Sequence, residues 1–231
     1  DFIKYLYLKY IQGEKTMDIN NPLYKNQGIH VILSLFTVED GKFKVFLIKR
    51  KNEPYKGKWI LIGGACYNNE DTDTAMKREL FEKTGIKDIN YKFYNVFSDP
   101  NRSPVCRMIA VVYIGVIDKT RVQFLKETEK TQDADWFDIE KVSGLGYDHD
   151  KILQNAIDYL RRNIFDTNIL KDLFPKYFTL PELHKAYESI LKKQIDRRNF
   201  RKRLLQQNII KDSGKIEEVK GKKPSKLYIF V

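Results

Sequence analysis

The stretch from Gly64 to Ile86, GACYNNEDTDTAMKRELFEKTGI, constrains the fold more than any other part of the chain. Within it, Asp71–Thr84 has helical spacing and acidic residues at its start, and Gly85 suits the position just after a helix. Glu79 and Glu82 are three residues apart, so they share one helix face and suit a hard divalent cation. We expect a helix with paired carboxylates. The alternative is an acidic helix with ordinary surface ion pairs.

The residues around this helix predict a mixed sheet of the α/β or α+β class. Gly28–Phe36 and Val45–Lys49 are rich in β-branched and aromatic residues and predict a hairpin, and further strands are expected at Trp59–Ile62, Tyr91–Phe97 and Met108–Ile117. Asp148–Phe165 is amphipathic at helical spacing, with Asp148 or Asp150 as its N-cap candidate. We interpret the Asp148-His149 pair as a helix cap rather than a catalytic pair.

The charge of the chain is concentrated near its C-terminus. The whole sequence carries a net charge of +11, and residues 171–231 contain 16 basic and 7 acidic side chains. A near-neutral first part followed by a basic second part indicates a polyanion partner, most often nucleic acid. The alternative is a lysine-rich, solubilising surface.

The order of elements in this basic part is typical of a winged helix-turn-helix. Thr179-Leu-Pro-Glu182 is a strong helix-start signal, Asp196 opens a second helix, and Ile209–Val231 reads as a hairpin. On the second helix Phe200 and Leu204 are expected to pack inward. The predicted DNA contacts are Arg197, Arg198, Asn199, Arg201 and Lys202 on that helix, and Lys222, Lys223 and Lys226 in the wing.

The Gly64–Ile86 stretch resembles the signature of the Nudix superfamily. The residues in register with it are Gly64, Glu70, Arg78, Glu79, Leu80, Glu82, Gly85 and Ile86. The resemblance implies a Nudix mixed-sheet sandwich. For an active enzyme it implies Glu79, Glu82, Arg78 and Glu70 as catalytic residues. It also implies Gly63, Glu79 and Glu82 as ligands of the Mg²⁺ or Mn²⁺ ion that is needed for hydrolysis of a pyrophosphate.

Three positions depart from the family pattern. Lys83 stands where the family has a second adjacent glutamate that normally binds metal, so the local charge changes by two units. The lysine can point to solvent or pair with Glu79 one turn back. Ile62 replaces a proline, and Ala65-Cys66 replaces a bulky apolar pair. These changes predict weak or absent hydrolysis.

Segments beside the signature resemble the Nudix branch that handles ADP-ribose. They read LIKRKNEPYKGKWILIGG before it and FSDPNRSPVCRMIAVVYIG after it. The resemblance suggests Arg50, Arg102 and Arg107 as ligands of a pyrophosphate, with Lys83 as a further positive charge near the phosphates.

From Tyr24 to Phe230 the chain resembles the NrtR transcriptional regulators, in which a Nudix domain precedes a winged helix. The implied organisation is an N-terminal extension (residues 1–23), a Nudix domain (24–148), and a linker helix with the winged helix domain (149–231). The resemblance further implies an ADP-ribose-like effector and homodimers that bind paired half-sites on double-stranded DNA.

The leading hypothesis is therefore a ligand-responsive transcriptional regulator, which needs no metal if it is purely a sensor. The alternatives are an active Mg²⁺-dependent hydrolase of ADP-ribose or another nucleoside diphosphate, and an RNA-linked Nudix enzyme. The chain has no run of eighteen apolar residues, and its two cysteines show no CxxC spacing. We expect a cytoplasmic protein without a membrane partner.

Overall fold

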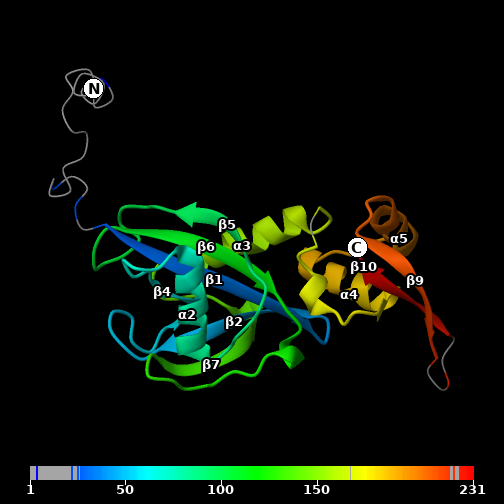
Figure 1. Cartoon of the computed structure of the whole chain (residues 1–231), viewed down its shortest axis with the longest axis horizontal. Coiled ribbons are helices and arrows are strands. Elements are labelled where there is room, and N and C mark those ends of the chain that lie inside the picture. The colour runs from blue at the N-terminus through cyan, green and yellow to red at the C-terminus, as the bar shows by residue number, and fades with distance from the viewer. Residues whose placement is uncertain are drawn as a thin grey trace.

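The computed structural model describes residues 27–166, 168–218, 221 and 224–231, together with the single positions 4, 22 and 25. These residues form a mixed-sheet domain followed by a smaller domain of helices and a hairpin (Figure 1). Most of the predicted N-terminal extension lies outside the described residues. Among the residues that are described, no helix combines the length and apolar character needed to cross a membrane.

A seven-stranded mixed sheet is the frame of the first domain. Its main path runs β3 (Trp59–Ile60), β2 (Lys42–Arg50), β1 (Gly28–Glu39), β6 (Met108–Val116) and β5 (Lys92–Phe97). Strand β6 lies parallel to β1, whereas all the other pairings are antiparallel. Two strands lie off this path, β4 (Ile62–Ala65) against β1 and β7 (Thr131–Asp138) against β2.

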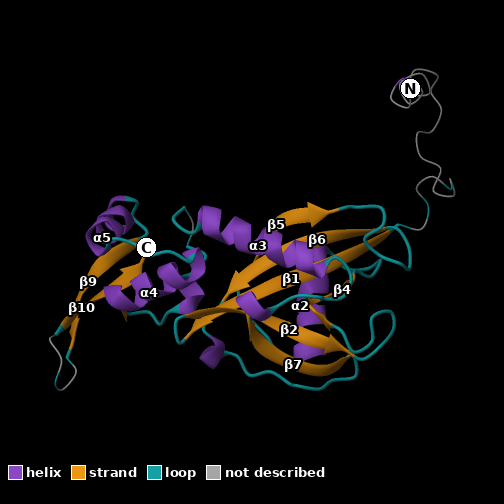
Figure 2. Ribbon diagram, turned by 180° about the vertical axis from the view of Figure 1, so that it is seen from behind, coloured by secondary structure: helices purple, strands orange, loops and turns teal. Residues whose placement is uncertain are grey.

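Two helices cover opposite faces of this sheet. Alternate residues of β1 face each side: Val31 and Leu33 share a core with α2 (Thr72–Thr84), while Ile32 and Phe36 share one with α3 (His149–Asn163). Figure 2 shows α3 across the face of the sheet opposite α2. Three short 3₁₀ helices, η1 (Lys119–Arg121), η2 (Ile139–Lys141) and η3 (Lys171–Leu173), lie in the connections.

The second domain has the expected winged-helix order. It contains β8 (Phe178–Thr179), α4 (Leu180–Leu191), α5 (Arg197–Gln206), β9 (Ile210–Glu217) and β10 (Ser225–Phe230). The strands form a three-stranded sheet in the order β8–β10–β9. Thr179 and Glu182 form the reciprocal capping box that their spacing predicts.

Most predicted elements are confirmed, and two differences concern the strands of the first domain. The stretch expected as one strand at Trp59–Ile62 is two strands, because β3 pairs with β2 while β4 pairs with β1. Strand β7 was not predicted, since its sequence TQDADWFD lacks the β-branched and apolar alternation of a half-buried strand. Its pairing with β2 from Lys44 to Arg50 stabilises the strand, although its local sequence has a low strand propensity.

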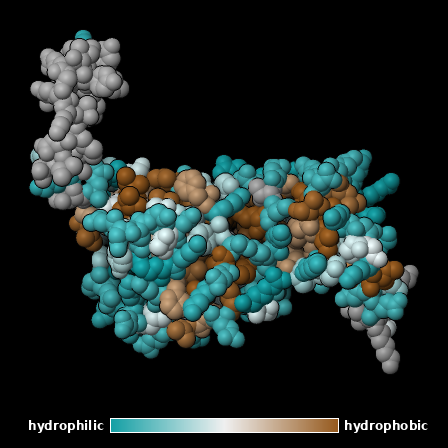
Figure 3. All heavy atoms as spheres, viewed as in Figure 1, coloured by the Kyte–Doolittle hydropathy of each residue, from teal (hydrophilic) through white to brown (hydrophobic). Residues whose placement is uncertain are grey.

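The two domains share one hydrophobic core. It runs from β1 and β2 through Leu153 and Leu160 of α3 to Tyr187 of α4 and Phe200 of α5. Polar contacts reinforce the junction: Ser189 Oγ donates to the Gly41 carbonyl at 2.8 Å. On the visible face, hydrophilic side chains predominate and exposed apolar residues form separate patches (Figure 3).

Candidate functional site

Arg78 of α2 is the centre of an ion-pair network formed by the signature residues. Its Nε and Nη2 donate to the two Glu70 carboxylate oxygens at 2.9 and 2.5 Å, and its Nη1 donates to Glu79 Oε1 at 2.7 Å. The same nitrogen donates to Glu82 Oε2 at 3.3 Å, as the four-residue spacing predicts. The guanidinium also lies 3.8 Å from the centre of the Tyr67 ring. These contacts fix the loop before α2 against the helix.

Lys83 turns inward from α2 and is largely buried. Its side chain is 8% exposed, its ammonium donates to the Gly63 carbonyl of β4, and it lies 3.1 Å from Glu79 Oε2. The pairing with Glu79 one turn back is confirmed, and the alternative of a solvent-pointing lysine is wrong. Burial lowers the pKa of Lys83, which the carboxylate of Glu79 partly offsets.

Glu79 lies against bare backbone because position 64 has no side chain. A Cβ added at Gly64 would lie 2.2 Å from Glu79 Cδ, so any larger residue there would displace the carboxylate. Burial alone would raise the pKa of Glu79, but the charges of Lys83 and Arg78 outweigh burial and hold that pKa below its usual value. Glu79 is therefore an ionised carboxylate enclosed by two cations.

The other carboxylate of the pair is also neutralised. Glu82 Oε2 accepts a hydrogen bond from Lys130 Nζ at 2.5 Å, from the turn before β7. Within the described ranges, no group of three or more His, Cys, Asp or Glu side chains is arranged to hold a metal ion. Of the expected metal ligands, Gly63 and Glu79 already surround the Lys83 ammonium. As arranged, this donor set does not fit Mg²⁺ or Mn²⁺, because a lysine fills the space between its oxygens.

Arg50 and Arg102 lie near Lys83, around the buried His149 and the half-buried His30. His149 accepts a hydrogen bond from the Leu61 amide at its Nδ1, at 3.0 Å. Burial, Arg102 and Lys83 lower the pKa of His30 to about 4, and the same causes lower the pKa of His149 well below its usual value. Arg50 also contributes to both shifts. Burial is the largest cause of both shifts, and the further lowering by the three cations indicates a positive potential suited to an anion.

Arg102 is almost fully buried, with its side chain 1% exposed. Its Nε and Nη2 bind both oxygens of Asp148, while its Nη1 has no partner. Asp148 occupies the N-cap position of α3, but its side chain makes no capping bond because Arg102 holds it. The prediction that Asp148 stands at the N-cap of α3 is therefore confirmed, but its carboxylate does not cap the helix. The Nη1 atom is thus a buried donor without a hydrogen-bond partner among the described residues.

The predicted ligand residues do not all converge. Arg50 donates to the carbonyls of Glu53 and Pro54 and lies 5.4 Å from the centre of the Tyr147 ring. Arg107 donates to the Ser98 carbonyl at 2.8 Å and is not among the main causes of the lowered pKa of either histidine. Arg50, Lys83 and Arg102 thus form one positive cluster, and Arg107 stands apart.

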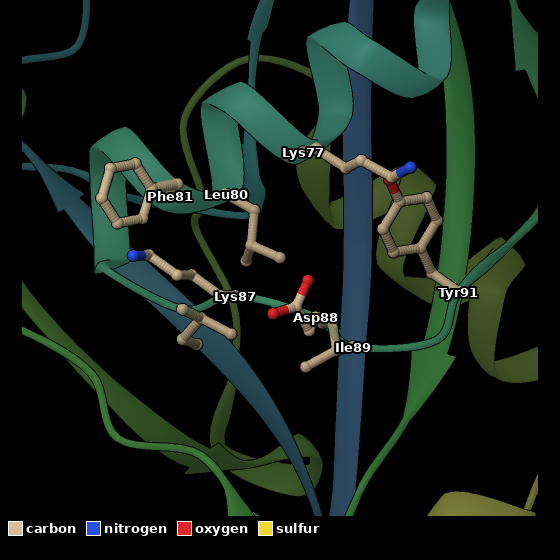
Figure 4. Close-up of a pocket in the computed structure, with 8 residues that line it drawn as sticks. Lys77, Leu80, Phe81, Lys87, Asp88, Ile89 and Tyr91 are labelled. Carbon is tan, nitrogen blue, oxygen red and sulfur yellow. The ribbon is translucent and has the colours of Figure 1, made fainter.

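Two of the cavities in the described part of the chain lie against α2. One of about 240 Å³ is lined by Leu80, Phe81 and Tyr91, with Lys77 beside Tyr91, and includes no carboxylate of the signature (Figure 4). Another, of about 390 Å³, includes Glu82 and Lys130. Neither cavity is lined by Arg50, Lys83 or Arg102, so the positive cluster lies outside both.

The second helix of the winged domain presents a basic, exposed face. Phe200 and Leu204 are buried as predicted. The five predicted contact residues of α5 are exposed: Arg197, Arg198, Asn199, Arg201 and Lys202. Asp196 caps the helix through the Asn199 amide at 2.8 Å. In the hairpin, Lys226 pairs with Asp212 at 3.0 Å, whereas Lys222 and Lys223 lie outside the described residues.

Sequence reasoning missed three residues of this site: His30, Lys130 and Tyr147. His30 lies in an apolar strand, and Lys130 is 48 residues from the Glu82 that it binds. No spacing signal connects such positions, because only the sheet brings them together.

The comparisons with known proteins match both domains. The NUDIX domain family matches residues 28–157, and the NrtR DNA-binding winged helix domain matches residues 170–230. An ADPR-responsive transcriptional repressor, NtrR, from Acinetobacter baylyi is 28% identical over 211 residues, which are 90% of this chain and 83% of that protein. An ADP-ribose pyrophosphatase from Methanocaldococcus jannaschii is 32% identical over 133 residues, 58% of this chain and 75% of that protein.

A solved structure shares the two-domain arrangement. Shewanella oneidensis NrtR, crystallised with a 27mer DNA, superposes with a TM-score of 0.75 at 26% identity. The match covers 88% of this chain and 93% of that one, so it includes the sheet domain and the winged helix.

Proposed function

This chain belongs to the Nudix family and ends in an NrtR winged helix domain, and we propose that it is an ADP-ribose-responsive transcriptional regulator. The observation that carries the proposal is the joining of a degenerate Nudix site and a winged helix in one chain through one continuous core. A structural change at the Nudix site can therefore reach the winged helix through the side chains of this core.

The exposed face of α5 supports a role in DNA binding. Arginine reads guanine bidentately and asparagine reads adenine, and Arg197 and Asn199 are both exposed there. The charge excess of residues 171–231 supplies the sequence-independent attraction to phosphates. In this proposal α5 enters the major groove and the wing, with Lys222, Lys223 and Lys226, contacts the backbone.

The positive cluster supports an anionic effector. Arg50, Lys83 and Arg102 act together on His30 and His149, and Arg102 has a free buried donor. A pyrophosphate offers the dispersed negative charge that such a cluster binds. ADP-ribose contains this group, and the Acinetobacter and Methanocaldococcus relatives are both named for it.

The proposal includes weak or absent hydrolysis. Nudix hydrolases typically use a divalent metal, and here the carboxylates Glu79 and Glu82 are already paired with lysines. An active ADP-ribose hydrolase is the second candidate, because all four signature residues Glu70, Arg78, Glu79 and Glu82 are present and the chain is 32% identical to an ADP-ribose pyrophosphatase. Fast metal-dependent release of AMP and ribose phosphate would favour that candidate.

A homodimer in the cytoplasm completes the proposal. Winged-helix regulators bind two half-sites through two-fold symmetry, so one α5 from each protomer would read one half-site. A DNA partner also implies a location with access to the chromosome.

Selection from a duplex library tests the DNA-binding part. The full chain would be presented with random duplexes of about 30 base pairs, which accommodate two half-sites one or two turns apart. We expect enrichment of a two-fold symmetric sequence and, for about six phosphate contacts, a slope of log K against log salt near −5. ADP-ribose should change the affinity for the selected duplex. No enrichment, together with a flat salt dependence, would contradict the proposal.

A further inference from the structure

The position of the Lys83 ammonium is unusual for a lysine on a helix. An i,i+4 pair on a helix surface is normally exposed and weak. Here the lysine side chain is 8% exposed and the glutamate side chain 4%, and the ammonium also bonds the Gly63 carbonyl of a neighbouring strand. The ammonium therefore lies between two oxygens that come from separate elements.

Those two oxygens are hard, oxygen-donor ligands of the kind that Mg²⁺ and Mn²⁺ prefer. Gly64 lets the Glu79 carboxylate rest on the β4 backbone, which brings it beside the Gly63 carbonyl. The site is thus built for a cation, and the cation present is covalently part of the chain.

We propose that the Lys83 ammonium is a tethered cation that replaces the divalent metal between Gly63 and Glu79, so that this site binds a pyrophosphate ligand without metal. The inference rests on the proposed function for the identity of the ligand, and deepens it by stating what the site requires. The statement that Lys83 takes the place of the metal depends only on the geometry of Lys83.

The neighbouring charges support this assignment. Lys130 holds Glu82 at 2.5 Å, and Arg78 bonds Glu70, Glu79 and Glu82. No signature carboxylate is left without a cation. An incoming divalent ion would meet the Lys83 ammonium at the oxygens it needs, and the like charges would repel.

The tethered charge also acts where the ligand is proposed to bind. Lys83 contributes with Arg50 and Arg102 to the lowered pKa values of His30 and His149. The positive charges of the three side chains therefore add up at one place, and they are present whether or not a metal ion is bound.

The first experiment measures ADP-ribose binding to the full chain by calorimetry, once with EDTA and once with MgCl₂. We expect dissociation constants that agree within about twofold. Lys83→Met keeps the stem but removes the charge, and should weaken binding about tenfold or more under both conditions, as expected for a lost charged contact. Lys77→Met, on the exposed side of the same helix, is the matched control and should leave binding unchanged.

The second experiment needs no nucleotide. Binding of Mn²⁺ alone is followed by the electron paramagnetic resonance signal of the free ion. The unmodified chain should hold no tight Mn²⁺ at this site, whereas Lys83→Glu should gain one site. Lys77→Glu, with the same charge change, should gain none.

The outcomes separate the two proposals. Wild-type ADP-ribose binding that requires Mg²⁺, Lys83→Met binding equal to wild type in EDTA, or one tight Mn²⁺ in the unmodified chain that Lys83→Met does not alter would each overturn the tethered-cation inference. If ADP-ribose fails to bind under any condition while the Mn²⁺ results are as expected, the effector assignment fails and the replacement of the metal stands. Circular dichroism of each variant confirms that it is folded.

Discussion

Arg102 and Asp148 form a two-pronged ion pair, with Arg102 Nε and Nη2 at 3.0 and 2.8 Å from the two Asp148 oxygens. The pair joins the loop before β6 to the first turn of α3, across 46 residues of sequence. Because the arginine side chain is 1% exposed, its charge depends on this carboxylate for compensation.

Asp148→Asn should therefore destabilise the protein by about 3 kcal/mol, the scale for leaving a buried charge unpaired. Urea denaturation measures the change. Asp135→Asn is the control, because Asp135 pairs with Lys126 only at 3.8 Å on the surface, and its loss should cost less than about 0.5 kcal/mol. Equal effects of the two substitutions would show that Arg102 is not dependent on Asp148.

Gly64→Ala should displace the Glu79 carboxylate, since the new Cβ would fall 2.2 Å from Glu79 Cδ. We expect a loss of about 1–3 kcal/mol in stability from overpacking, and a marked loss of ADP-ribose affinity. Chemical denaturation and calorimetry give the two values. Ala65→Ser, at the next and exposed position, should leave both unchanged.

The pH dependence of the unfolding free energy should reflect the lowered pKa of His30. The pKa of His30 is lowered from 6.5 to about 4 in the folded protein, by burial first and then by Arg102 and Lys83. Between these two values the unfolded chain takes up a proton and the folded chain does not, so stability falls as the pH falls. The contribution of this residue approaches about 1.4 kcal/mol per pH unit.

His30→Gln removes that proton uptake and should flatten the curve of unfolding free energy between pH 6.5 and about pH 4. Above pH 7 the variant and the unmodified protein should run parallel. An unchanged slope below pH 6.5 would mean that His30 is protonated in the folded state as easily as in the unfolded one. His149 remains in both proteins, so the difference between the curves isolates His30.

Two residues of α5 should affect DNA binding differently. Asn199→Ala should weaken the selected duplex by about 1–3 kcal/mol and random DNA much less, because base contacts specify sequence. Arg201→Ala should weaken both and reduce the magnitude of the salt slope by about 1 if it contacts a phosphate. Fluorescence anisotropy with both duplexes at several salt concentrations measures these effects. Reversed behaviour would exchange the two assigned roles.

The sequence predicted the ends of helices well where a capping residue determines where the helix begins or ends. Asp71 caps α2 through the Thr74 amide and Gly85 ends it with a positive φ of 73°, as its sequence predicts. The capping box at Thr179 and Glu182 is equally local. Such features depend on residues three or four apart, which the sequence displays directly.

The electrostatic partners could not be predicted in the same way. From the sequence, Lys83 can either point to solvent or pair with Glu79. Only the packing of β4 beside α2 selects the inward position. Asp148 has an equally good local role as a helix cap, yet the more deeply buried Arg102 takes its carboxylate. Long-range burial decides between such local alternatives, and burial is a property of the fold.

The continuous core between the sheet and the winged helix has a consequence for how the chain unfolds. Phe36 of β1, Leu160 of α3 and Phe200 of α5 belong to one buried cluster, so neither domain can melt without exposing apolar surface of the other. The chain should behave as a single cooperative unit, with one thermal transition detected by probes in either half. Substitutions in the sheet would then reduce DNA binding in cells by lowering the amount of folded protein, even where they touch neither the effector nor the operator.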